Sequence, residues 1–404
     1  MKIVNILRFS NPFSFSINEV LGYFLIVFSL IPWVNFGTNN MDSQPWPLLF
    51  GLLFLITSFE TKILYKDVLI FLLPFFALIS WLFFSKNVID FIALRAFISY
   101  FTISVCLFGF LIFLRKYEFP WKLVIFINII YLVVGLLQLY YPNLVASIVI
   151  QRGLGLGGRG VTGLAPEPTF FAIYLFFISF IYLAQLNFKI DSRIFYLVTA
   201  NVLAIIFLTK SASVLLFVIL SAPFFLITRM SFKSLIYLTL VIIFITPIFF
   251  IILEESRIMT LFTLLSEEGL WTLIFKDASV NDRLANVVFP LHGFYINNFL
   301  PSGFHSFTQM HSYLTDFYQG FFNYGSGSTS ILSYVGAFLY ELGFLGFLFL
   351  TFIFFRMQDG SISRLFDTLL LFILLNSSVP PSFPLIPLLF AIFIVSSEKK
   401  RTLN

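Results

Sequence analysis

Charged residues are scarce in this sequence, and cysteine and histidine are nearly missing. Of the 404 residues, 11% are charged and 59% are hydrophobic, whereas soluble domains carry about 25% charged residues. A soluble protein of this composition would leave too much apolar surface facing water, because a large part of any folded chain stays on its surface. The shortage of charge therefore excludes a soluble enzyme and predicts that most of the exterior faces lipid.

The single cysteine, Cys106, lies within an apolar run, which excludes a disulfide framework and a cysteine-based metal site. The net charge of +5 is small and no basic tract occurs, so no nucleic-acid partner is expected. Lys2 and Arg8 precede the first apolar stretch, but no small-residue cleavage site follows it. We therefore predict a retained first membrane span and not a removable signal peptide.

Long apolar runs dominate what is present. A helix that crosses a bilayer needs about 20 largely apolar residues, and such runs must be helical because lipid offers the backbone no hydrogen bonds. The sequence predicts an all-α polytopic membrane protein with one integral membrane domain over 1–404. We expect about twelve spans, at 17–36, 46–57, 67–84, 90–114, 121–141, 168–186, 194–208, 211–228, 234–253, 331–355, 365–375 and 384–395.

Lysine and arginine alternate between the two sides of these spans. Short cytoplasmic loops collect positive charge, and most of the 24 lysines and arginines fall on one side if both termini are cytoplasmic. That side includes Lys66, Arg115, Lys116, Arg356, Arg364, Lys399, Lys400 and Arg401. We therefore predict cytoplasmic termini and functional chemistry on the outer face.

Two long loops are expected on that outer face. The first, 142–167, is rich in glycine, and the second, 254–330, is far longer than the usual connection of about 4–6 residues. The second contains Trp271 and all three histidines, a composition that argues against disorder. Within it, residues 258–275 mix apolar and acidic side chains in a pattern typical of a helix that lies in the membrane interface.

The first loop carries the segment Gly153-Leu-Gly-Leu-Gly-Gly-Arg-Gly160. Its glycine spacing matches that of a dinucleotide-binding turn, but that turn must follow a strand, and a predicted membrane helix precedes this one. The backbone N–H groups of such a loop, with Arg152 and Arg159, are suited to closing around an anion such as pyrophosphate. The plain alternative is a mobile connector with solvated arginines.

Glu167 follows in the sequence Pro166-Glu167-Pro168. Each proline fixes its own φ angle and restricts the residue before it, so this carboxylate is held rigidly at the start of a helix. It either stabilises that helix through the helix dipole or acts as a site carboxylate. In the second role it orients an arginine or accepts a proton from a hydroxyl nucleophile, and the two roles are compatible.

Further cations lie on the outer side. Arg257 and Arg283 belong to the second loop, and an arginine can form forked contacts with phosphate oxygens. Lys210 lies in a turn between two predicted spans, where it either joins an anion pocket or caps a helix end. The plain alternative for each arginine is a solvated loop residue.

His305 and His311 do not have the i, i+4 spacing of a helical zinc pair, so we predict no metal site. His305 follows a glycine turn, and it is either a surface or packing residue or a general base. Glu341 lies deeper in a predicted span than the other charges, and charges there are usually paired or functional.

These motifs resemble those of the O-antigen polymerase and O-antigen ligase superfamily. The resemblance rests on the many spans and on short motifs from about Gly153 to Leu350. Those motifs are the glycine-rich loop, Gly163-Leu-Ala-Pro-Glu-Pro-Thr169, Leu208-Thr-Lys-Ser211, Ser279-x-x-x-Arg283, Pro301-Ser-Gly303 and Glu341-Leu-Gly-Phe-Leu-Gly346.

The resemblance implies a GT-C-like membrane glycosyltransferase at the periplasmic face of a bacterial inner membrane. Its substrates would be glycans linked to undecaprenyl pyrophosphate, and it would need no cofactor and no metal. The pyrophosphate ligands would be Arg159 and Arg283, with Arg152 and Arg257 as helpers and Lys210 as a further candidate. The candidate bases are Glu167 and His305.

Polymerase and ligase differ in their acceptor. The ligase pattern places a histidine close to the helix after the long loop, but Gly325-Ser-Gly-Ser-Thr-Ser330 has none, and the Glu-Pro-Thr sequence is more polymerase-like. The resemblance therefore favours a polymerase of lipid-linked repeat units over a ligase that transfers glycan to lipid A core. A polysaccharide transporter or flippase is the rival from another class, although transporters often break their helices near mid-bilayer and here polar residues concentrate in two loops. A chain-length regulator as an additional partner stays open.

Overall fold

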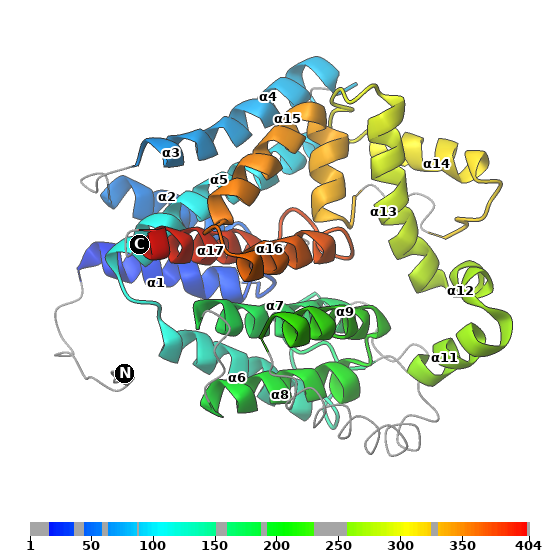
Figure 1. Ribbon diagram of the computed structural model, residues 1–404, viewed down its shortest axis with the longest axis horizontal. Coiled ribbons are helices and arrows are strands. Elements are labelled where there is room, and N and C mark those ends of the chain that lie inside the picture. Colours follow the sequence, from blue (N-terminus) through cyan, green and yellow to red (C-terminus); the bar gives the residue numbers. More distant parts are fainter. Residues whose placement is uncertain are drawn as a thin grey trace.

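The computed structural model describes residues 16–35, 44–58, 64–86, 89–150, 160–186, 192–229, 257–324 and 330–401. In these ranges the chain forms helices and turns and no strand (Figure 1), which confirms the all-α prediction. The predicted span 234–253 lies outside the described residues. The elements are α1 (Ile17–Leu30), α2 (Trp46–Thr57), α3 (Tyr65–Val68), η1 (Leu69–Phe71), α4 (Leu72–Phe84), α5 (Phe91–Lys116), α6 (Trp121–Leu137), α7 (Pro168–Gln185), α8 (Ser192–Ala204), η2 (Ile205–Thr209), α9 (Ala212–Arg229), α11 (Arg257–Glu268), α12 (Leu270–Lys276), α13 (Ala278–Ile296), α14 (Phe307–Phe317), α15 (Tyr334–Met357), α16 (Ile362–Leu374) and α17 (Leu385–Arg401).

Several helices have the length and composition of membrane spans. Within the described residues, four stretches are long and apolar enough to cross a bilayer: Tyr65–Phe84, Phe91–Lys116, Pro168–Gln185 and Tyr334–Met357. Shorter apolar helices cover Ile17–Leu30, Trp46–Thr57, Trp121–Leu137 and Arg193–Thr209. The structure thus shows a helical protein whose apolar helices suit a membrane, and the number of twelve spans stays a prediction.

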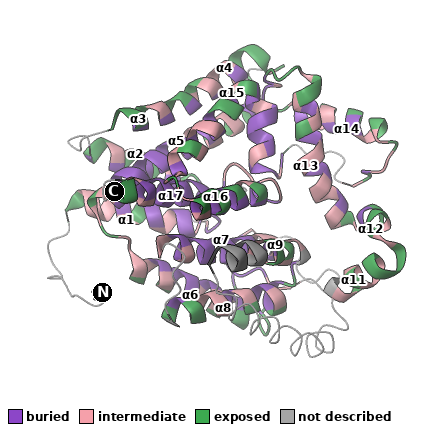
Figure 2. Ribbon diagram, in the orientation of Figure 1, coloured by how far each residue is buried: buried purple, intermediate pink, exposed green. Residues whose placement is uncertain are grey.

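The core of the bundle is formed by α5, α7 and α17, which are mostly buried (Figure 2). Residues 103–114 of α5 are buried without interruption, and Cys106 lies among them. A helix that is apolar on every side is expected in such a position, surrounded by other helices. High hydropathy therefore marks both the lipid-facing helices and the helices that they enclose.

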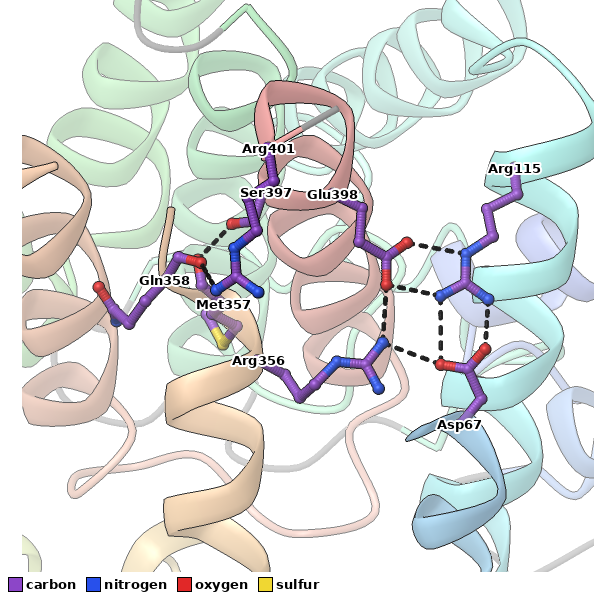
Figure 3. A network of polar contacts seen from close by, with 8 residues as sticks. All are labelled: Asp67, Arg115, Arg356, Met357, Gln358, Ser397, Glu398 and Arg401. Carbon is purple, nitrogen blue, oxygen red and sulfur yellow. Dashed lines mark hydrogen bonds and ion pairs between the residues drawn. The ribbon is translucent and has the colours of Figure 1, made fainter. Parts of the chain in front are cut away.

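Four charged side chains join α3, α5, α15 and α17 at one end of the bundle (Figure 3). Arg115 donates hydrogen bonds to the carboxylates of Asp67 and Glu398. Arg356 Nη2 donates to the same two groups, at 2.9 Å to Asp67 Oδ1 and 2.7 Å to Glu398 Oε1. Because the side chain of Asp67 is only 1% exposed, its charge depends on these two arginines.

The same end of the bundle holds the beginning of α1. The hydroxyl oxygens of Ser16, which precedes α1, and of Tyr117, which follows α5, lie 3.3 Å apart. Since α5 and α17 both finish at the charge network, the first and last described helices begin and end on one side. The position of both termini relative to a membrane stays a prediction.

We expect Arg356→Met to destabilise the protein, because Asp67 would keep a buried charge with one partner fewer. Leaving a buried charge without any partner costs about 3–5 kcal/mol, and because Arg115 still pairs with Asp67 the loss should stay below that value, within reach of thermal unfolding of the purified protein in detergent. The control is Lys400→Met, which breaks the more exposed pair with Asp359 and should change Tm little. Equal losses in the two variants would contradict the role given to the network.

The helices α11 to α14 lie at the opposite end, where α13 runs across the bundle (Figure 1). Asp277 caps α13 by accepting a hydrogen bond from Val280 N at 2.8 Å. The predicted long outer loop is therefore largely helical. The single interface helix predicted at 258–275 is wrong in one respect, because Gly269 adopts a φ of 85° and separates α11 from α12.

The helix α15 is broken at Gly343, whose φ of 59° and ψ of −141° are not helical. The break receives a segment of the outer loop: Ser302 N donates to Tyr340 O at 3.0 Å, and Phe344 N donates to Phe299 O at 2.8 Å. The span predicted at 331–355 is thus interrupted, because its glycine lets another backbone approach closely.

A methyl group at Gly343 would lie 2.4 Å from Pro301 N, so Gly343→Ala should displace the outer loop as well as strain φ. Gly360 has a φ of 85° with no atom within 4 Å of a Cβ, so Gly360→Ala reports backbone strain alone, about 1–2 kcal/mol. We expect the larger fall in Tm, and faster proteolysis around Pro301, for Gly343→Ala. A fall no larger than that of Gly360→Ala would show that the break does not hold the loop.

Candidate functional site

The first turn of α7 meets α13 at the end of the bundle opposite the charge network. Arg283 Nη2 in α13 donates a hydrogen bond to Thr169 Oγ1 in α7 at 3.1 Å. Thr169 comes directly after Glu167 and Pro168, so this contact joins the end of the first predicted loop to the second. Two polar segments that are 114 residues apart therefore touch.

Glu167 precedes the first residue of α7 and has an extended backbone, with φ −143° and ψ 155°. Pro168 is the first helical residue, where its missing N–H costs no hydrogen bond. The half-buried carboxylate caps no N–H of the helix, although the helix dipole still favours a negative charge there. Glu167 is thus held near Thr169 without being used as a capping group.

The end of the glycine-rich segment packs on the π-helical turn η2. Val161 N donates to Leu208 O at 2.8 Å, and a Cβ on Gly160 would lie 2.0 Å from the same oxygen, so only glycine fits. Beyond η2, Lys210 is exposed and adopts the left-handed conformation with φ 49°. The structure therefore brings Lys210 close to the end of the glycine-rich segment, and π-turns of this kind are frequent at functional sites.

Gln138 holds the turn between the glycine-rich segment and α7. Its Oε1 accepts from Gly163 N at 2.7 Å, and its Nε2 donates to Thr162 Oγ1 at 3.2 Å. The amide is buried at the end of α6, and a buried amide with its groups bonded fixes the backbone that it contacts. The sequence did not single out Gln138, because it ends an apolar run and belongs to no motif.

His305 lies in another part of the same end of the bundle. Its Nδ1 bonds the carboxylate of Asp90, which precedes α5. The residue after it bonds the hydroxyl of Tyr340, whose ring covers Gly293 in α13. Gly293 is roughly 15 Å along α13 from Arg283 at 1.5 Å per residue. Of the two candidate bases, Glu167 is therefore the one beside the Arg283 contact.

Asp282 and His311 were not selected as site residues from the sequence, yet Asp282 adjoins Arg283 in α13 and interacts with His311. Burial raises the pKa of Asp282, while Arg283 and His311 act to lower it. Burial also lowers the pKa of His311, whose ring packs edge-on against Phe289 with centroids 4.8 Å apart. No spacing in the sequence connects these residues, because Asp282 belongs to α13 and His311 to α14.

Three of the predicted pyrophosphate ligands are not placed. Arg152 and Arg159 lie outside the described residues, and the side chain of Arg257, the first residue of α11, is not described. Their role stays a prediction. In the part of the chain that the structure describes, no group of three His, Cys, Asp or Glu residues is arranged to hold a metal ion.

No protein-family model, curated protein or solved structure matches this chain. The resemblance to the O-antigen polymerase and ligase superfamily therefore stays a prediction, and arguments about function depend on the geometry described above.

The buried His311 predicts a pH dependence of stability. Its pKa is lowered in the fold, so the unfolded chain binds the proton first as pH falls through the ordinary value of 6.5, and stability should fall with it. The raised pKa of Asp282 acts in the opposite direction, because the folded chain keeps that proton above the ordinary value of 3.8. We expect His311→Phe to flatten the decline in Tm below neutral pH, since phenylalanine keeps the ring contacts and does not titrate.

The control for this measurement is His292→Phe. His292 bonds the hydroxyl of Tyr318 through Nδ1 at 3.0 Å, and it belongs to the same pair of helices. Both variants replace a histidine with phenylalanine, so a flattening specific to His311→Phe would assign the decline to that residue. If His311→Phe gave a curve parallel to that of the wild type, His311 would not be the group responsible.

Proposed function

We propose that the protein is a membrane glycosyltransferase that polymerises a surface polysaccharide from repeat units linked to undecaprenyl pyrophosphate. The supporting observation is the Arg283–Thr169 contact of 3.1 Å, which places a guanidinium near Glu167 at one end of a bundle of apolar helices. A guanidinium fork matches phosphate oxygens, and apolar helices beside it suit a donor that hangs from a lipid.

In this reaction the acceptor hydroxyl attacks the anomeric carbon of the donor sugar, and the bond from that carbon to the pyrophosphate oxygen breaks. Negative charge grows on the pyrophosphate, where Arg283 stabilises it. Glu167 takes the proton of the hydroxyl. Lys210, Arg152, Arg159 and Arg257 are the further candidates for binding the pyrophosphate. The products are a longer glycan, built onto the non-reducing end of a new lipid-linked repeat, and free undecaprenyl pyrophosphate.

This function places the two ends of the bundle on different sides of a bacterial inner membrane. The end with the charge network would face the cytoplasm, and α11 to α14 would face the periplasm. The basic residues Lys399, Lys400 and Arg401 in the last turn of α17 support this direction, because cytoplasmic flanks collect positive charge.

A ligase that transfers glycan to lipid A core would use the same donor chemistry with another acceptor. A flippase or transporter is the alternative from another class, and the break in α15 is the feature that favours it, because transporters bind substrates at broken helices. Here the outer loop bonds Tyr340 O and Phe344 N at the break. These backbone groups are therefore hydrogen-bonded within the protein and are not available to bind a substrate.

We expect Arg283→Ala to abolish long surface glycan in a strain whose own gene is deleted and replaced. Loss of one group that stabilises the charge of a transition state lowers rates about 100-fold to 1000-fold. A gel of the surface glycan should show single repeats on core where the wild type gives a ladder. Loss of all attached glycan would point to a ligase or flippase, and an unchanged ladder would remove Arg283 from the site.

Two further variants isolate the role of the guanidinium. Arg283→Lys keeps the charge and loses the fork, so it should give a shortened ladder. Lys400→Ala removes an exposed cation at the other end of the bundle, where Lys400 pairs with Asp359, and it should leave the ladder unchanged.

A further inference from the structure

The corner between α11 and α12 exposes large apolar side chains. Trp271 is 71% exposed, and Phe262, Leu265, Leu270 and Phe275 are each at least 43% exposed. Soluble surfaces rarely gather such residues without a partner, and a tryptophan in water leaves a large apolar area unburied. Something apolar must therefore cover this corner in the working protein.

The corner is held in shape by polar contacts. Lys276 Nζ lies 2.7 Å from Glu268 Oε1, which ties the end of α12 to the end of α11. Asn281 Nδ2 donates to Ile274 O at 3.1 Å and to Phe321 O at 2.8 Å, which ties α12 to α13 and to the turn after α14. The exposed apolar residues thus belong to two helices that are fixed by hydrogen bonds and an ion pair, and not to a loose loop.

The two sides of α11 differ in character. At 100° per residue, Glu267 is about 140° around the helix from Phe262 and about 160° from Leu265. Glu267 is exposed, whereas Glu268 is only about 60° from Leu265 and pairs with Lys276 at the end of α11. An apolar side opposite a polar side is the pattern of a helix that lies along a membrane surface.

The neighbouring elements favour lipid as the occupant. The apolar run 234–253 comes shortly before α11 in the sequence, and α13 lies across the outer ends of the apolar helices (Figure 1). The far end of α13 also exposes Tyr295, Phe299 and Leu300. Exposed aromatic residues thus lie beside both ends of α13, and such residues are enriched at membrane interfaces. If the apolar helices cross a bilayer, lipid already lies next to this corner, and no further partner is needed to cover it.

We propose that the corner of α11 and α12 inserts its apolar side, led by Trp271 and Phe262, into the outer leaflet of the bilayer. The polar side with Glu267 then faces water. This places α13 flat on the leaflet and sets Arg283 at the depth of the lipid phosphates. The inference concerns the membrane and does not require glycosyl transfer.

The test uses nitroxide labels on the full chain in vesicles of phosphatidylethanolamine and phosphatidylglycerol. The native Cys106 is fully buried, so a single introduced cysteine takes the label. We expect labels at Phe262→Cys and Trp271→Cys to collide mainly with oxygen, which dissolves in lipid. A label at Glu267→Cys should collide mainly with a water-soluble nickel chelate, and the ratio of the two collision rates should differ several-fold between the sides.

Two results would overturn the proposal. Nickel accessibility at Phe262→Cys and Trp271→Cys equal to that at Glu267→Cys would place the corner in water. Low accessibility to both probes would show that a protein, such as a second copy of the chain, covers it. Wild-type Tm and elution volume check folding, and Leu265→Cys replaces Phe262→Cys if that variant misfolds. Because the readout needs no activity, its failure is distinct from an unchanged glycan ladder in Arg283→Ala.

Discussion

Lipid solvates neither charges nor unpaired backbone groups, and this constraint gathers the polar groups of the chain at the two ends of the bundle. Asp67, Arg115, Arg356 and Glu398 come from four helices and neutralise one another at one end of the bundle. At the other end, polar groups from the first turn of α7 and from α13 meet. Between the two ends, α5, α7 and α17 bury apolar residues in long runs. The distribution of polarity along the bundle axis thus decides where binding chemistry can exist.

At the end opposite the charge network, α13 organises what surrounds the Arg283 contact. Asn281 Nδ2 donates to the carbonyls of Ile274 and Phe321. Its Oδ1 accepts from Asn323 N and Tyr324 N. Asn286 accepts from Leu332 N at 2.9 Å and donates to Asp282 O at 2.9 Å. Arg283 therefore projects from a helix whose neighbouring turns are bonded on several sides. The backbone that carries Arg283 is therefore fixed, and its side chain contacts Thr169.

Most helices were predictable from hydropathy, because a run of about 20 apolar residues is rarely anything other than a helix. The start of α7 at Pro168 also followed from the sequence. The break at Gly343 did not, because it depends on residues 299–302 of a distant segment. Asp282 and His311 escaped notice for the same reason, since they become neighbours only through the packing of α14 on α13. His305 was selected from the sequence because it follows a glycine turn, whereas its partner Asp90 could be identified only from the fold.

The half of α15 beyond Gly343 has a mechanical consequence. At its outer end it is bonded to residue 299 of the loop region, and near its other end Arg356 is bonded to Asp67 and Glu398. The 13 residues from Phe344 to Arg356 form a stiff helical segment about 20 Å long at 1.5 Å per residue. A ligand that displaces residue 299 must therefore tilt this helical segment or strain the ion pairs of Arg356 with Asp67 and Glu398. A movement at one end of the bundle is thus transmitted to the other end.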